Sequence, residues 1–217
     1  MVTARSIALA VALGAAAPAP ATAGEPTAAA TARLPRAWIG VKAGALLPQA
    51  FTPLGTNLVV DAEAGLVLPF GGGHLEVMAW AAYAQPPADG ASLDARVPGG
   101  AYDWSITQRE LSVAVAGVFR LQRPSPSARL APYVGLGPKL YFLQTKANGA
   151  AAGQPFGEYS ETSTELGGTV LGGVDYRVGP GTVVGELEVG LSDLDHLTTG
   201  DASTGSVEVK VGYRFWF

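Results

Sequence analysis

Eight stretches of the chain alternate apolar and polar side chains with a period of two, which is typical of β-strands. They cover residues 37–47, 57–68, 74–83, 104–121, 130–143, 164–178, 182–192 and 206–217. In the last stretch the apolar positions are Val207, Val209, Val211, Tyr213, Phe215 and Phe217, and the intervening positions include Glu208, Lys210, Gly212 and Arg214. No 3.6-residue period follows the first thirty residues, so the pattern predicts an all-β fold.

The connections between these stretches alternate in length. Residues 69–73, 122–129 and 179–181 form tight or short turns, whereas the other four connections are longer. We expect residues 84–103 and 144–163 to be loops, because the first is too rich in Gly and Pro for a strand interior and the second is rich in small residues. Four hairpins in succession predict an eight-stranded antiparallel up-and-down β-barrel.

The amino-terminal region has the pattern of a targeting segment. Arg5 precedes an apolar stretch, residues 7–17, that is too short to span a bilayer, and residues 21–23 read Ala-Thr-Ala. This pattern predicts a secretory signal peptide over residues 1–23. The Ala-, Thr- and Pro-rich residues 24–36 are expected to form a short periplasmic tail, which leaves residues 37–217 for the barrel.

Composition excludes several classes of protein. The 217 residues contain no cysteine, so neither a disulfide framework nor a lipidated cysteine is available. Charged residues make up 15% and the formal net charge is −4. Because nucleic-acid binders normally carry a basic face, we expect no nucleic-acid partner.

The polar face of the predicted strands carries most of the charge. Nine acids and six bases share this face, with His74 as a further member when protonated. These residues are Lys42, Asp61, Glu63, Glu76, Glu110, Arg120, Lys139, Glu165, Asp175, Arg177, Glu186, Glu188, Glu208, Lys210 and Arg214. The apolar face carries almost only Arg109, which is near a loop end.

Alternation alone fits two directions of the barrel wall. The apolar face could point inward, as in a soluble lipocalin-like barrel, or outward into lipid. Glycines share the charged face, and they would make room for long side chains in a lumen that is only wide enough for side chains to fill it. Aromatic residues lie near both ends of the apolar face, in the manner of interfacial girdles. We therefore predict a transmembrane barrel whose charges fill the lumen.

The charged lumen suggests either a paired ion network or a narrow path for small solutes. Buried charges are tolerated when they are paired and hydrogen-bonded, so we expect a structural network. A lipid-modifying enzyme is a further alternative, because His196 and Thr198, with Glu208, loosely resemble the triad of lipid A deacylases. Acids around residue 195 suit a hard cation. We nevertheless predict no catalytic site, metal or cofactor, since no phosphate loop, zinc spacing or nucleophile elbow occurs.

The final strand resembles the closing strand of bacterial outer-membrane barrels, in which a terminal Phe follows aromatic or aliphatic residues at every second position. Val211, Tyr213, Phe215 and Phe217 match this assembly signal. Residues 37–217 are similar to the small barrels of the OmpA, OmpX and OmpW-like families. The resemblance implies a location in the outer membrane, contact with its lipid, insertion by the barrel-assembly machinery, and loops that serve a structural or interaction role with an unidentified ligand.

Overall fold

The computed structural model describes residues 37–48, 54–96, 99–122, 129–196, 201–203 and 205–217. The signal peptide predicted for residues 1–23 and the tail predicted for residues 24–36 lie outside these ranges.

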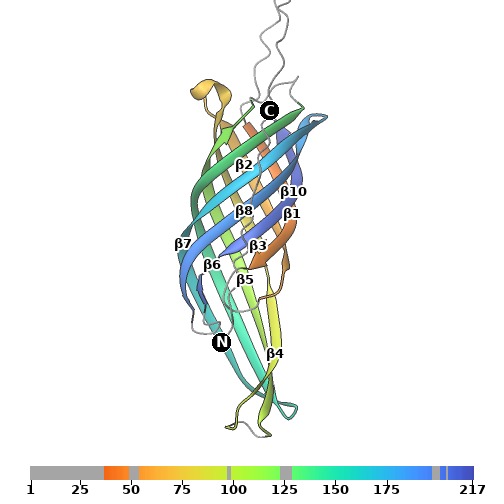
Figure 1. Ribbon diagram of the computed structural model, residues 1–217, viewed down its shortest axis with the longest axis vertical. Helices are drawn as coiled ribbons and strands as arrows, with labels where there is room; N and C mark the ends of the chain where they lie inside the picture. Colours follow the sequence, from red (N-terminus) through yellow and green to blue (C-terminus); the bar gives the residue numbers. More distant parts are fainter. Residues whose placement is uncertain (1–36, 49–53, 97–98, 123–128, 197–200, 204) are drawn as a thin grey trace, which may run out of the picture. The chain divides into compact units, whose positions relative to one another are not determined.

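The described chain is built almost entirely of antiparallel strands (Figure 1). In chain order these are β1 (Ala37–Pro48), β2 (Asn57–Val67), β3 (Leu75–Ala84), β4 (Pro87–Leu93), β5 (Ala101–Arg120), β6 (Leu130–Ala151), β7 (Gln154–Val178), β8 (Gly181–His196), β9 (Asp201–Ser203) and β10 (Ser206–Trp216). A short 3₁₀ turn, η1 (Gly71–Gly73), joins β2 to β3. Among the described residues, no helix is long and apolar enough to cross a membrane.

Eight of the strands close into a barrel. The sheet order is β10, β1, β2, β3, β5, β6, β7, β8, and β10 also pairs with β8. Closure places Ile39 opposite Phe215 on one side of β10 and Val209 opposite Leu187 on the other. Because every edge of the barrel wall is paired, the backbone hydrogen bonds are satisfied within the wall. The predicted eight-stranded antiparallel barrel is confirmed.

The two faces of the wall differ as the alternation predicts. On β5, Val113 is 42% exposed on the outside, whereas its neighbour Ala114 is 2% exposed in the lumen. The same phase holds on β8, where Val183 faces outward and Val184 is fully buried. The apolar band therefore forms the outer surface, and the lumen takes the opposite positions.

The predicted loops at 84–103 and 144–163 are wrong in part. β4 pairs with the first third of β5, and β6 and β7 pair as far as a turn at Ala151–Gln154. In Figure 1 these segments project beyond the ends of the other strands. Small residues are poor strand formers alone, but here each strand gains a ladder of hydrogen bonds from its neighbour. Local composition therefore underestimates strand length in a long hairpin.

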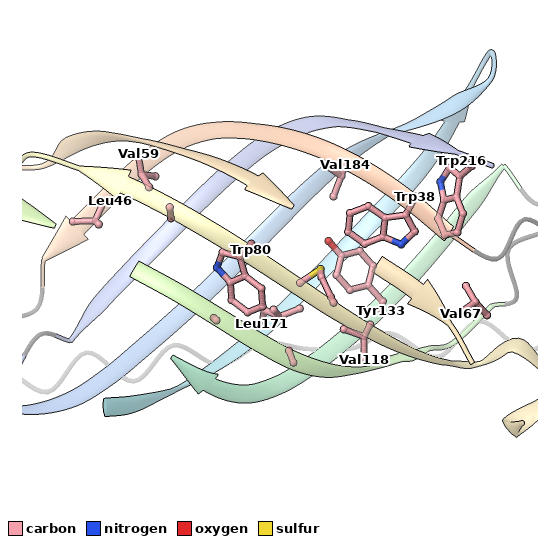
Figure 2. Packing of buried hydrophobic residues seen from close by; sticks show 14 of the residues in the cluster. Trp38, Leu46, Val59, Val67, Trp80, Val118, Tyr133, Leu171, Val184 and Trp216 are labelled. Atoms are coloured by element: carbon pink, nitrogen blue, oxygen red, sulfur yellow. The ribbon is translucent and has the colours of Figure 1, made fainter. Parts of the chain in front are cut away.

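Large aromatic side chains in the lumen rest on glycines of neighbouring strands. A Cβ atom added to Gly65 would collide with the indole of Trp38, and one added to Gly173 would collide with the ring of Tyr133. Figure 2 shows Trp38, Tyr133 and Trp216 within the cluster of buried hydrophobic residues. Glycine thus supplies the space that inward-facing rings need in a narrow barrel.

The Gly65→Val substitution is expected to destabilise the folded barrel by about 2 kcal/mol, because it overpacks the space under Trp38. The matched control is Gly117→Val, since a Cβ atom at Gly117 meets nothing within 4 Å. Urea unfolding of the barrel in lipid vesicles, followed by electrophoretic mobility without boiling, measures both. Equal midpoints for the two variants would show that the Trp38–Gly65 contact imposes no constraint.

Candidate functional site

The lumen gathers most of the charged residues that the sequence places on the polar face. Thirteen of the fifteen are buried. Glu165 and Arg177 are only half-buried, because Glu165 lies beyond the start of the β7–β8 pairing at Gly167 and Arg177 lies at the β7–β8 turn. His74 is also half-buried, and its Nδ1 lies 2.7 Å from the carbonyl oxygen of Arg120.

Two arginines organise the end of the lumen near the short turns. Arg120 Nε donates to Glu76 Oε2 over 2.5 Å, and its Nη1 donates to Asp175 Oδ2 over 2.6 Å. Arg214 contacts the second oxygen of Asp175 at 3.0 Å and binds both oxygens of Glu63, at 2.7 and 2.9 Å. The two guanidinium groups therefore share one carboxylate and form one connected cluster.

The network continues through three lysines. Lys42 Nζ lies 2.9 Å from Glu63 and 2.5 Å from Glu186. Lys210 Nζ lies 2.9 Å from Asp61, 2.5 Å from Glu188 and 2.9 Å from Glu208.

Lys139, on β6, completes the network toward the long hairpins. Its Nζ donates to Glu188 over 2.9 Å and to Glu208 over 2.8 Å. Each of the five buried cations thus joins at least two carboxylates, and the contacts run without a break from Glu76 to Glu208.

Burial makes this network strongly dependent on its pairing. The side chains of Lys42, Glu63 and Glu186 have 0% exposure. These atoms are shielded from solvent, so their attraction is only weakly screened, and the loss of one partner leaves part of the buried charge uncompensated. Seven of the eight buried carboxylates share the five buried cations, and Glu110 makes no ion pair with the described cations. The network is therefore acid-rich at its outer end.

Several neutral side chains complete the network, and charge patterns alone miss them. Trp38 Nε1 donates to Glu76 over 2.9 Å, and the Tyr133 hydroxyl donates to Glu186 over 2.7 Å. The Thr169 hydroxyl donates to Glu188 over 2.9 Å. The Arg214 guanidinium lies 4.2 Å from the centre of the Trp38 ring. The strand phase identifies all these positions as inward-facing, although it does not identify their partners.

The four residues of the expected assembly signal lie on the outward-facing side of the closing strand, β10. Val211 and Phe217 are 64% and 61% exposed, Phe215 is 44% exposed, and Tyr213 is half-buried. Phe217 exchanges two backbone hydrogen bonds with Ala37, of 2.9 and 3.2 Å. The side chain of Phe217 is thus presented outward while its backbone ties the two terminal strands together.

Most side chains of the candidate catalytic and cation-binding groups lie outside the described residues. Thr198 and the side chain of His196 lie outside the described residues, and Glu208 is engaged by Lys139 and Lys210 inside the lumen. Among the residues searched, no group of three His, Cys, Asp or Glu side chains has the arrangement of a metal site.

Sequence comparison assigns the family. Residues 7–215 match the model of the outer membrane protein beta-barrel domain. The chain belongs to this family. It is an integral barrel of the bacterial outer membrane, and its apolar band faces lipid while its charges fill the lumen. No curated protein matches the chain significantly in sequence.

Solved structures that are similar to the chain include other outer-membrane barrels. A major outer membrane protein from Thermus thermophilus is 12% identical, with a TM-score of 0.51 over 83% of this chain and 99% of that one. Neisserial surface protein A is 16% identical, with a TM-score of 0.48 over 83% and 97% of the two chains. The attachment invasion locus protein of Yersinia pestis, in complex with sucrose octasulfate, is 17% identical, with a TM-score of 0.42 over 83% and 97%. At these identities the likeness concerns the fold alone.

The Arg214→Met substitution is expected to destabilise the barrel by about 4 kcal/mol, because it removes one of the two buried cations that pair with Glu63 and one of the two that pair with Asp175, and so leaves excess negative charge in the lumen. The control is Arg96→Met, since Arg96 is exposed and pairs only locally with Asp94. Denaturant unfolding in lipid vesicles provides the measurement. If both variants unfold at the wild-type midpoint, the lumen charges do not depend on one another as the distances indicate.

Proposed function

We propose that this outer-membrane barrel is a sealed anchor that neither transports solutes nor catalyses a reaction, and that displays an extracellular sheet for contacts at the cell surface. The observation that carries the proposal is the lumen itself. Lys42, Lys210 and Arg214 cross it with side chains that have 0% exposure. A lumen filled in this way supports anchoring in preference to permeation.

A lipid-modifying enzyme is the weaker candidate. A triad needs its base and nucleophile within hydrogen-bond reach of each other and of the substrate. Glu208 is 1% exposed and is bound to two lysines inside the barrel. A lipid approaching the outer wall does not meet this carboxylate, so Glu208 is unsuited to orient a catalytic histidine there.

The projecting sheet supports the interaction role. It consists of β4 and the outer parts of β5, β6 and β7, and it is packed around Leu54, Ala88 and Ile106. Among the described strands, β4 pairs with β5 alone, and β7 pairs with its second partner, β8, only from Gly167 onward. Both outer edges therefore present backbone groups that an extended segment of a partner can bind. We propose that the unidentified ligand of the loops binds this sheet.

Planar-bilayer recordings of the folded protein are expected to show no steady single-channel steps. A second variant lacks residues 146–160 and joins Thr145 to Glu161, which are paired across β6 and β7. It should also remain closed, because the seal is made by side chains within the barrel wall. Steady steps from the wild type would support the solute channel. Steps from the shortened variant alone would assign the seal to the hairpin.

We further propose that Val211, Tyr213, Phe215 and Phe217 are read by the barrel-assembly machinery. This proposal is supported by the alternate side chains of β10, the strand that closes the barrel, because they face outward. The side chain of Phe217 adds no hydrogen bond to the closure, because the contacts with Ala37 are made by backbone atoms.

The Phe217→Ala substitution should lower the amount of folded barrel in the outer membrane several-fold while leaving the unfolding midpoint of purified, refolded protein nearly unchanged. Phe70→Ala is the matched control, since Phe70 is a similarly exposed phenylalanine, at 63%. Quantification of heat-modifiable protein in membranes and urea titration provide the two measurements. A loss of stability that accounts for the whole loss of yield would assign Phe217 to the fold and not to assembly.

A further inference from the structure

An apolar groove crosses the lipid-facing wall of the barrel over β10, β1, β2, β3 and β5. Its volume is about 740 Å³. Its floor includes three small side chains on adjacent strands, Ala43, Ala62 and Ala81. The lining also includes larger side chains, namely Val41, Val60, Tyr83, Leu111, Val211 and Tyr213. The wall is therefore hollowed at a place where a uniform row of large aliphatic residues would be flat.

The end of the groove nearest the extracellular hairpins has a polar and cationic rim. Tyr83 and Leu111 are paired across β3 and β5 at this end. The Tyr83 hydroxyl donates to the side chain of Gln85 over 3.2 Å. The backbone N–H of Gln108 donates to the carbonyl of Pro86, which brings residues 85–86 beside residues 108–109.

Arg109 occupies the rim on the same outward face as Leu111. It lies two residues further toward the hairpins, a rise of about 7 Å along a strand. Arg109 is exposed and makes no side-chain hydrogen bond or ion pair with any described residue. An unpaired guanidinium above an apolar groove is complementary to an acyl chain that carries a phosphate at its head.

From this arrangement we infer that the groove is a specific site for a phosphorylated, acylated lipid of the outer leaflet. One acyl chain lies along Ala43, Ala62 and Ala81, and the phosphate accepts hydrogen bonds from Arg109. The rest of the lipid-facing wall contacts lipid without selecting it. At this site the groove and the Arg109 side chain lie next to each other, so they can bind one lipid together. It is independent of the sealed lumen and of the extracellular sheet.

The test uses the full-length folded protein in detergent, with purified diphosphoryl lipid A as the probe and native mass spectrometry as the readout. We expect a saturable one-to-one adduct. Arg109→Gln should weaken it about tenfold, as for the loss of a charge-assisted hydrogen bond. The double substitution Ala62→Leu with Ala81→Leu should abolish it by filling the groove. Diacylglycerol, which has acyl chains but no phosphate, should bind equally well to the wild type and to the Arg109→Gln variant.

Two matched controls keep the result interpretable. Ala64→Leu with Ala79→Leu adds the same volume to another lipid-facing pair of β2 and β3 that does not line the groove. Arg96→Gln removes the same charge from an exposed loop. Both should bind lipid A as the wild type does, and unboiled mobility verifies that each variant is folded. Equal binding of lipid A by all variants overturns the site. The site is also overturned if the wild type forms a dimer and no lipid adduct, and if the groove-filling substitutions abolish that dimer.

Discussion

The structure depends on the mutual compensation of charges in a lumen that is closed to water. The cations Arg120, Arg214, Lys42, Lys210 and Lys139 each link carboxylates from different strands. The apolar face of every strand is used against lipid, so the buried hydrophobic residues of the lumen, such as Trp38 and Leu171, share the interior with charged ones. The interior must then be made of the polar face, and such a face is stable only when nearly every buried group has a partner.

Glycine makes this interior geometrically possible. A barrel of eight strands leaves room for little more than the side chains themselves. The rings of Trp38 and Tyr133 lie over Gly65 and Gly173, and these rings in turn contact the Arg214 guanidinium. The glycines, the aromatic rings and the Arg214 guanidinium thus form one packed unit. The same unit fills the lumen.

The sequence predicts the barrel and the direction of its side chains well, because both follow from a period of two. Phase alone places Lys139 and Arg214 inside and Val113 outside. Which cation meets which acid is not predictable in this way, since Arg214 and Glu63 are separated by 151 positions and meet only through closure. Strand length is also underestimated, because the hairpin of β6 and β7 is stabilised by pairing and not by local propensity. The burial of Glu165 is also not predictable from phase. Its side chain is at an inward position, but β7 is not yet paired with β8 at this residue, so the side chain is only half-buried.

The most direct test of the account is a nitroxide scan along β5 in lipid bilayers. The chain has no cysteine, so single cysteines at residues 111–118 can each carry one label. Collision with oxygen reports exposure to acyl chains. We predict strong oxygen collision at Leu111, Val113 and Val115, with labels at Ser112, Ala114 and Ala116 protected. The opposite phase would contradict the central claim, because it would place the ionic face against lipid and the apolar face inside.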